Sequence, residues 1–287
     1  MILPTHRNNA ALEKAIESVL SQTFTDFELI VVLDQLKVSK KDLNALAQGD
    51  SRVIFANNVG IGIEDALNTG IEMANGIFVA RMDGDDWSTP TRFDSQIRYL
   101  RETGAKIVGG QIKIVDPDGA CKMITRYPKR VRSSRAFRPL RSLVAHPTVV
   151  MEKQVLAEAG GYRKSFPRAE DLDLWNRLLS TYDIHNLDET VLHYTSSGQD
   201  SASLSMQLDS SAAAVSKLPN IKGDKSQSPA LARFRRLFAF SYYRFVSYHS
   251  VKDQGSRPRK GTWGYFLGAA IYLWCWIRRE GKLTRRC

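Results

Sequence analysis

Cysteines and long apolar runs are scarce in this sequence. The three cysteines, Cys121, Cys275 and Cys287, lie far apart without C-x-x-C spacing, so the sequence signals neither a zinc site nor a disulfide framework. We therefore expect reduced thiols. No opening segment combines basic residues with a long apolar core, as an export signal would, and these absences together favour the cytoplasm.

Acidic residues are scarce at the C-terminal end of the chain. The whole sequence carries 41 Lys or Arg against 30 Asp or Glu, a net charge of +11. Residues 231–287 contain thirteen of the basic residues and two acids, and 13 − 2 = +11, so the entire excess lies there. Such a segment is suited to an acidic partner, either nucleic acid or an anionic membrane surface.

The basic segment also contains an uncharged aromatic run over residues 262–277. These sixteen residues would span roughly 24 Å as a helix, which is short against the ~30 Å hydrocarbon core of a bilayer. Trp and Tyr side chains prefer the membrane interface. We expect residues 230–287 to form a helical tail, peripheral or monotopic on the inner face of the cell membrane, with packing against the preceding domain as the alternative.

The rest of the 287-residue chain has the composition and patterning of one globular domain. Continuous apolar runs alternate with segments of helical periodicity, which predicts an α/β domain with a mainly parallel sheet flanked by helices. We place this domain at residues 1–205 and a linker rich in Ser, Ala, Lys and Pro at 206–229. The expected strands cover residues 28–33, 52–56, 76–80 and 106–115.

The opening "MILP" is short for a first strand, because strands usually contain about five or six residues. Either the natural start lies upstream or this strand is unusually short. A helix should follow behind Asn8 or Asn9 as its N-cap, and another behind Pro90.

Three carboxylates follow the apolar run "GIFVA" in the stretch "GIFVARMDGDDW". In an open parallel sheet, ligands bind beyond the carboxyl ends of the strands, which places Asp83 and Asp85 at the floor of a cleft. Two carboxylates one residue apart suit Mg²⁺ or Mn²⁺, with the remaining ligands supplied by diphosphate oxygens and water. The alternative is an acidic turn whose side chains bind local backbone groups.

Several sequence blocks occur in an order that resembles the family 2 glycosyltransferases, inverting enzymes of the GT-A fold. The resemblance covers about residues 1–200 and is strongest to members that build bacterial surface polysaccharides such as exopolysaccharide, O-antigen or capsule. Its blocks are "ILPTHRNNAALEKAIESVLSQTFTDFELIVVLD", "NNVGIGIEDALNTGIEMANGIFVARMDGDD", "STPTRFDSQ", "HPTVVM", "GGYR" and "AEDLDLWNRLL". It implies a sugar transferase of the hexosyltransferase type that uses a nucleotide-diphosphate sugar and a divalent metal.

The resemblance implies roles for the residues around the nucleotide. Thr5 and Asp34 match positions that hold the nucleotide, and a carboxylate at 34 can accept the N–H of a uracil ring. The remaining candidates on the donor side are Asn57, Asn58, Gly60, Arg81 and Asp83. Arg81 could either face a phosphate or pair with an aspartate. Asn and Gly also tolerate positive φ in turns, so the Asn57–Gly60 stretch can equally be structural. Gly60 and Gly62 lack the third glycine of a dinucleotide-binding loop.

By the same resemblance Asp171, in the first turn of a helix that begins near Glu170, is the base that takes the proton of the acceptor hydroxyl. Glu170 is the reserve candidate. A helix N-terminus lowers the pKa of a carboxylate, so we expect a weak base whose action is supplemented by the metal on the leaving diphosphate.

Candidates on the acceptor side are His146, Arg135 and Arg138, the two arginines lying in the acid-free segment "RYPKRVRSSRAFRPLRS". That segment is suited to the diphosphate of a lipid-linked acceptor, and an ordinary solvated loop is the equal alternative. His193 is expected to be structural rather than a metal ligand.

We therefore expect an inverting glycosyltransferase that moves a sugar, UDP-linked in the first instance, to a glycan acceptor held at the membrane. A sugar-phosphate nucleotidyltransferase is one alternative, although its usual glycine-rich opening loop is absent. A non-catalytic membrane or nucleic-acid binder is another, and nucleic acid is disfavoured because the clustered carboxylates would repel phosphate unless a metal intervened. The sugar, the acceptor and the oligomeric state are not specified by these patterns.

Overall fold

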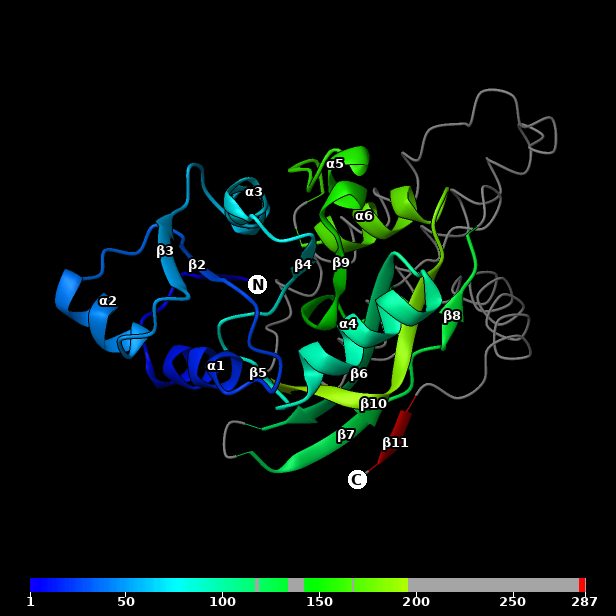
Figure 1. Ribbon diagram of the computed structural model, residues 1–287, viewed down its shortest axis with the longest axis horizontal. Helices are drawn as coiled ribbons and strands as arrows, with labels where there is room; N and C mark the ends of the chain where they lie inside the picture. Colours follow the sequence, from blue (N-terminus) through cyan, green and yellow to red (C-terminus); the bar gives the residue numbers. More distant parts are fainter. Residues whose placement is uncertain (117–118, 134–141, 167, 196–283, 287) are drawn as a thin grey trace, which may run out of the picture.

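The computed structural model describes residues 1–116, 119–133, 142–166, 168–195 and 284–286 (Figure 1). The strands are β1 (Ile2–Thr5), β2 (Leu29–Leu33), β3 (Val53–Asn57), β4 (Phe78–Ala80), β5 (Trp87–Ser88), β6 (Ile107–Val115), β7 (Cys121–Thr125), β8 (Arg130–Val131), β9 (Val150–Glu152), β10 (Ile184–Thr195) and β11 (Thr284–Arg286). The helices are α1 (Ala10–Leu20), α2 (Lys40–Ala47), α3 (Ile63–Met73), α4 (Arg92–Thr103), α5 (Lys153–Ala159) and α6 (Glu170–Leu178), with a short 3₁₀ helix η1 (His146–Thr148). Within these residues, no helix is long and apolar enough to cross a membrane.

The first sheet consists of β1, β2 and β3, which run parallel. Successive side chains of β2 face opposite sides of this sheet. Val31 packs in the core cluster that contains Leu12 and Ile16 of α1, whereas Ile30 packs in the cluster that contains Leu67 of α3. Helices therefore cover both faces of the sheet, as Figure 1 shows, and this explains why the sequence of β2 is continuously apolar.

The helix boundaries follow the sequence signals. The side-chain oxygen of Asn9 accepts a hydrogen bond from the backbone N–H of Leu12 at 3.1 Å, which makes it the N-cap of α1. Helix α4 begins two residues after Pro90, and α6 begins at Glu170 as expected. All four strands predicted from apolar runs are present within one or two residues.

The second sheet is mixed, so the prediction of a mainly parallel sheet is wrong for this half of the domain. Its path is β11-β7-β6-β10-β5, with β4, β8 and β9 joined at the side. Among its pairs, β6 and β10 run parallel, and the others are antiparallel. The short connection between β6 and β7 reverses the chain directly and so makes the two strands antiparallel. A parallel pair would need a longer crossover connection.

Among the residues that the structure describes, the two sheets meet at one point, between β1 and β4. Ile2 and Arg81 form an isolated parallel bridge, and the N–H of Met82 donates to the carbonyl of Ile2 at 3.2 Å. Strand β1 ends in the donor-side sequence "PTHRNN", and β4 leads directly into "RMDGDD". The single bridge therefore sets the relative position of the two loops that we expect to form the site.

Two expectations are corrected at residues that the structure describes. Residues Thr284–Arg286 form β11, which pairs antiparallel with β7, so the helical prediction is wrong at these three residues. Cys121, at the start of β7, is disulfide-bonded, so the expectation of reduced thiols is wrong there. The predicted linker at 206–229 and the remainder of the predicted tail lie outside the described residues.

Arg92, the first residue of α4, is fully buried and is hydrogen-bonded to the residue that follows β4. Its guanidinium donates to the carbonyl of Arg81 at 2.7 Å, to the hydroxyl of Ser88 at 3.0 Å and to the side chain of Gln96 at 3.1 Å. Burial lowers the pKa of Arg92 to about 9. The interior accepts this charge because all three guanidinium nitrogens have partners.

Replacing Arg92 by methionine should lower the free energy of unfolding by about 2–4 kcal/mol, because it removes the donor that the buried carbonyl of Arg81 and the buried hydroxyl of Ser88 share. Urea unfolding followed by circular dichroism measures this change. Arg98→Met is the matched control, because Arg98 lies on the same helix, is exposed and pairs with Asp94 at 3.1 Å. The control should change stability by less than about 0.5 kcal/mol, and equal losses in both variants would contradict the assignment.

Candidate active site

A cavity of about 340 Å³ lies beyond the carboxyl ends of β1, β2 and β4. Four predicted site residues line it together, namely Thr5, Asp34, Asp83 and Asp85. They come from three separate segments of the chain. They meet because the ends of neighbouring strands in an α/β sheet open into one crevice. The cavity thus brings together residues that were predicted for the donor and metal sites.

Asp34 is oriented by the loop between β3 and α3. The side-chain amide of Asn58 donates to one carboxylate oxygen of Asp34 at 2.8 Å, and the backbone N–H of Gly62 donates to the other at 3.1 Å. Asn58 does not line the cavity itself, but it orients Asp34, which does. The described Asn57 side chain is exposed and does not line the cavity.

Gly60 also lies outside the cavity lining, and its role is to permit a close approach. An added Cβ would lie 1.8 Å from a carboxylate oxygen of Asp65, which accepts the N–H of Ile61 at 2.8 Å. The positive φ of this loop occurs at Gly62, at 94°. The glycines therefore fold the loop tightly against α3, and Asn58 then points at Asp34.

The carboxylates after β4 have different surroundings. Asp83 receives both terminal nitrogens of Arg81, one of them at 2.9 Å. Burial of the Asp85 carboxyl, together with the nearby charge of Asp83, raises the pKa of Asp85. Asp86 is buried, accepts the N–H of Thr195 at 3.0 Å and has a second oxygen without a described partner. Burial and Asp83 raise the pKa of Asp86 well above its ordinary value.

The donor set of Asp83 and Asp85 fits a hard divalent cation. Both are carboxylates, both line the cavity, and burial followed by the negative charge of Asp83 raises the pKa of Asp85. In the part of the chain that the structure describes, no group of three or more His, Cys, Asp or Glu side chains is arranged to hold a metal. A cation here would therefore need further oxygen ligands from a bound diphosphate or water, as the sequence led us to expect.

Arg81 is buried and lies between the carboxylates of the cavity and those of α6. Burial opposes its charge, but Asp83, Tyr162 and Glu170 overcome that effect and raise the pKa of Arg81. Its side chain is thus committed to Asp83 rather than free to face a phosphate.

The two candidate bases stand side by side at the start of α6. Asp171 accepts the hydroxyl of Ser142 at 2.5 Å and the backbone N–H of Leu172 at 2.7 Å. Glu170 has one oxygen that is buried and has no described partner. The structure therefore holds the carboxylate of Asp171 in a fixed orientation and leaves that of Glu170 less constrained.

The expectation that the helix N-terminus lowers the pKa of these carboxyls is wrong. Burial, reinforced by Asp171, raises the pKa of Glu170 to about 7. Burial also raises the pKa of Asp171, although its hydrogen bonds from Ser142 and Leu172 oppose the increase. Loss of hydration outweighs the helix dipole here, and a higher pKa makes each carboxylate a stronger base than expected.

Both predicted histidines have structural surroundings. His146 is buried, its Nε2 lies 2.8 Å from the hydroxyl of Tyr162, and its ring packs edge-on against Trp175. Burial lowers the pKa of His146 well below its ordinary value. His193 stacks on Trp87 with ring centroids 5.1 Å apart and does not line the cavity. Arg135 and Arg138 lie outside the described residues.

Sequence patterns did not identify three residues that the structure places at the site. Arg7 and Tyr194 line the cavity beside Asp83 and Asp85, and Ser142 binds Asp171. Arg7 directly follows the predicted Thr5 region, which is a signal that could have been used. Tyr194 and Ser142 gave no signal, because their positions depend on how distant segments pack.

The sequence matches the family model described as Glycosyl transferase family 2 over residues 1–155. It is 31% identical over 201 residues to the O-antigen biosynthesis glycosyltransferase WbnJ of Escherichia coli, covering 68% of this chain and 78% of that protein. It is 30% identical over 186 residues to the amylovoran biosynthesis glycosyltransferase AmsE of Erwinia amylovora, covering 63% and 69%.

Two solved structures share the fold. S. aureus TarS 1–349 in complex with UDP-GlcNAc aligns with a TM-score of 0.60 at 17% identity, over 89% of this chain and 75% of that one. The mannosyltransferase PcManGT from Pyrobaculum calidifontis, in complex with GDP-Man and Mn²⁺, aligns with a TM-score of 0.59 at 14% identity, over 96% and 86%. Against a longer TarS chain the alignment spans 45% of its length. The fold is therefore GT-A-like, with a mixed sheet.

The pKa of Glu170 predicts a specific dependence of stability on pH. Between pH 4.5 and about 7 the folded state retains a proton on Glu170 that the unfolded chain has lost, so this residue lowers stability as pH rises through that window. Glu170→Gln removes the ionisation and should raise the free energy of unfolding at pH 8 by up to about 3 kcal/mol relative to its effect at pH 4.5.

Urea unfolding at the two pH values measures the difference. Glu102→Gln is the control, because Glu102 is exposed near the end of α4 and its substitution should act equally at both pH values. If Glu170→Gln is less stable than the parent at pH 8, the charge of Glu170 is compensated in the folded state and the prediction is wrong.

Proposed function

The chain belongs to glycosyl transferase family 2, and we propose that this glycosyltransferase takes its sugar from a nucleotide-diphosphate donor, UDP-linked in the first instance. The observation that supports the proposal is the cavity that joins Thr5 and Asp34 to Asp83 and Asp85. One end offers acceptors for a base or ribose, and the other end offers ligands for a metal and its diphosphate. The distribution of side chains thus follows the order of groups in a nucleotide sugar.

The nucleotide binds between the ends of β1 and β2 in this proposal. Asp34, whose two oxygens are fixed by Asn58 and Gly62, accepts the N–H of the uracil ring. Thr5 is already paired with Arg7 through a turn, in which the Thr5 hydroxyl donates to the Arg7 carbonyl at 2.8 Å. That turn positions Arg7 at the cavity wall, where its charge can meet the diphosphate.

Asp83 and Asp85 would hold Mg²⁺ or Mn²⁺ together with the diphosphate. A bound divalent cation would neutralise the negative charge that develops on the leaving diphosphate. Arg81 keeps the carboxylate of Asp83 in position through its paired nitrogens. Thr195 fixes the same loop, because its hydroxyl donates to the carbonyl of Asp85 at 2.6 Å.

Transfer occurs with inversion in this proposal. The acceptor hydroxyl forms a new bond to the anomeric carbon on the face opposite the diphosphate, and the bond from that carbon to the diphosphate oxygen breaks. Asp171 takes the proton of the acceptor hydroxyl, and the nucleotide diphosphate leaves with the electron pair. Ser142 holds Asp171 in orientation, and the raised pKa of Asp171 makes it a better proton acceptor than an exposed aspartate.

The acceptor that we propose is a glycan in surface-polysaccharide synthesis, lipid-linked and presented at the cytoplasmic face of the membrane. Support comes from the names of the relatives, which are O-antigen and amylovoran biosynthesis glycosyltransferases. The basic segment leading to Ser142 was the predicted acceptor side. Two of its described cations are already paired, Arg130 with Asp183 and Lys129 with Asp188. Membrane association of residues 230–287 stays a prediction.

Family membership disfavours both alternative functions. A non-catalytic binder would not require a cavity lined by Thr5, Asp34, Asp83 and Asp85, and a nucleotidyltransferase would not require a carboxylate such as Asp171 to accept the proton of a hydroxyl group. We retain sugar transfer as the function that these residues support best.

UDP should bind at least about tenfold more tightly in Mn²⁺ than in chelator, because Asp83 and Asp85 otherwise repel the diphosphate. Isothermal titration calorimetry measures both affinities. Asp85→Asn should remove most of the metal dependence, whereas Asp94→Asn, on the exposed face of α4, should leave it unchanged. Equal affinity in Mn²⁺ and in chelator would refute the metal assignment.

Asp171→Asn should slow sugar transfer by roughly 10²–10⁴ while leaving Mn²⁺-dependent UDP binding within a few fold, because it removes the proton acceptor and keeps the side-chain volume. The rate can be followed through hydrolysis of the donor if the acceptor is not in hand. Glu170→Gln is the matched control and should slow transfer much less. If Glu170→Gln loses activity and Asp171→Asn keeps it, the base is Glu170.

A further inference from the structure

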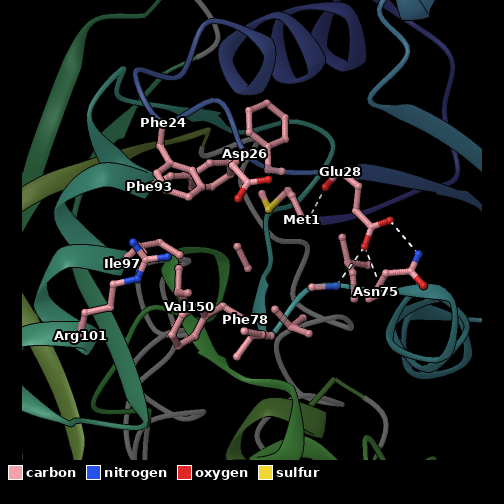
Figure 2. Close-up of a pocket in the computed structure, with 17 residues that line it drawn as sticks. Met1, Phe24, Asp26, Glu28, Asn75, Phe78, Phe93, Ile97, Arg101 and Val150 are labelled. Carbon is pink, nitrogen blue, oxygen red and sulfur yellow. Dashed lines mark hydrogen bonds between the residues drawn. The ribbon is translucent and has the colours of Figure 1, made fainter.

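The carboxylates beside the two ends of α3 have opposite surroundings. Next to the carboxyl end, at a cavity of about 520 Å³ (Figure 2), the Glu28 side chain accepts the backbone N–H groups of Asn75 at 2.6 Å and Gly76 at 3.2 Å. In the first turn of α3, Glu64 is only 8% exposed. Within the residues that the structure describes, its carboxylate makes no hydrogen bond or ion pair. A buried carboxylate without a partner costs stability, and the helix dipole offsets only part of that cost.

Glu64 lies beside the donor cavity. Ile63 and Ala66, from the same turn of α3, line that cavity. A Cβ added to Gly62 would lie 3.4 Å from Oε2 of Glu64, so the carboxylate is next to the residue whose N–H holds Asp34. Neither oxygen of Glu64 is among the buried polar atoms without a partner in the described residues, so both remain open to solvent.

Glu64 is also close enough to α6 to act on its first carboxylate. After burial and Asp171, the charge of Glu64 contributes to the raised pKa of Glu170. Arg81 opposes this increase, and it pairs with Asp83 at the donor cavity. The start of α3, the end of β4 and the start of α6 therefore surround one space, between the proposed metal ligands and the proposed base.

The transferred sugar must occupy this space in the proposed function, because its anomeric carbon lies between the diphosphate and the acceptor hydroxyl during transfer. A sugar ring carries hydroxyl groups, and each oxygen of a carboxylate can accept a hydroxyl hydrogen bond. A uronic acid has a carboxylate in place of the hydroxymethyl group. It would bring a further negative charge beside Glu64 and Glu170, where like charges repel.

We propose that Glu64 is a specificity-determining residue for the sugar that is transferred. Its carboxylate accepts hydrogen bonds from the hydroxyl groups of a neutral sugar and disfavours a nucleotide-linked uronic acid by charge repulsion. This inference rests on the proposed function, because it requires a nucleotide sugar in the donor cavity. A first-turn acid that serves only the helix dipole would have no effect on the sugar.

UDP-glucose and UDP-glucuronic acid test the proposal, because they differ only in the group at C6 of the sugar. Isothermal titration calorimetry in Mn²⁺ at low salt measures the affinities of both and of UDP. The protein should bind UDP-glucuronic acid at least about tenfold more weakly than UDP-glucose. Glu64→Gln keeps the side-chain volume and removes the charge, so it should narrow this difference by at least about threefold while UDP affinity stays within about twofold.

A second variant, Glu64→Ala, tests the hydrogen bonds to the sugar. Among UDP-glucose, UDP-galactose and UDP-N-acetylglucosamine, the donor that the protein hydrolyses best should lose at least about fivefold in kcat/KM, because the acceptor of its hydroxyl groups is gone. Glu72→Gln is the control for both measurements. Glu72 lies on the same helix and is exposed, so its substitution removes the same charge away from the cavity and should change neither result.

The outcomes separate this inference from the proposed function. An unchanged ratio of the two affinities in Glu64→Gln, with UDP binding intact, would overturn the role of Glu64 and leave the proposed function standing. An equal change in Glu72→Gln would do the same, because the effect would then belong to the net charge. Loss of UDP binding in Glu64→Gln together with a lower thermal midpoint would assign Glu64 to the fold and also overturn the inference. Failure of the unaltered protein to bind UDP or any of these UDP-sugars in Mn²⁺ would contradict the proposed function itself.

Discussion

The site depends on one buried cation at the end of β4. The side chain of Arg81 pairs with both oxygens of Asp83, and its charge lies close to Glu170. Its backbone takes part in both sheets, through the bridge to Ile2 and the bond to Val149. The residue that balances the acidic cavity is therefore also the residue at which the two halves of the domain meet. Any shift of this cation would move the donor carboxylates and the sheets together.

Folding gathers more negative charge here than Arg81 can balance. Burial and like charges raise the pKa of Asp85, Asp86 and Glu170 in the described structure. Each such shift lowers the stability of the folded state at neutral pH, because ionisation of these groups is less favourable in the folded state than in the unfolded chain. The carboxylates of such a site repel one another, and binding a cation, or taking the proton of an acceptor hydroxyl, reduces this repulsion. Its acidity is thus a cost to the fold and a requirement of the proposed chemistry.

The sequence predicted the local secondary structure, but it did not predict which distant strands pair. The apolar run of β2 and the Asn9 cap of α1 are set by residues close together in the chain, and both were predicted correctly. Strand direction in the second sheet depends on which distant segments pair, and periodicity does not encode it. The pKa of Asp171 was predicted in the wrong direction because the burial that raises it arises only when the chain folds, and it outweighs the hydrogen bond from Ser142 that lowers it. Tyr194 was missed for the same reason, since it reaches the cavity from a strand more than a hundred residues after Asp83.

The donor and base sides of the site are built by different parts of the chain, and this division has a consequence for specificity. The donor cavity uses the ends of β1, β2 and β4, with Tyr194 attached to the same loop through Thr195. The proposed base, Asp171, lies on α6 and accepts a hydrogen bond from Ser142, which lies between β8 and η1. Arg81 links the two sides, because its positive charge interacts with both Asp83 and Glu170. In the proposed mechanism, changes in the segment before Ser142 would therefore alter which acceptor approaches Asp171 while the proposed nucleotide contacts of Asp34 stayed intact, so acceptor choice would vary on a constant donor site.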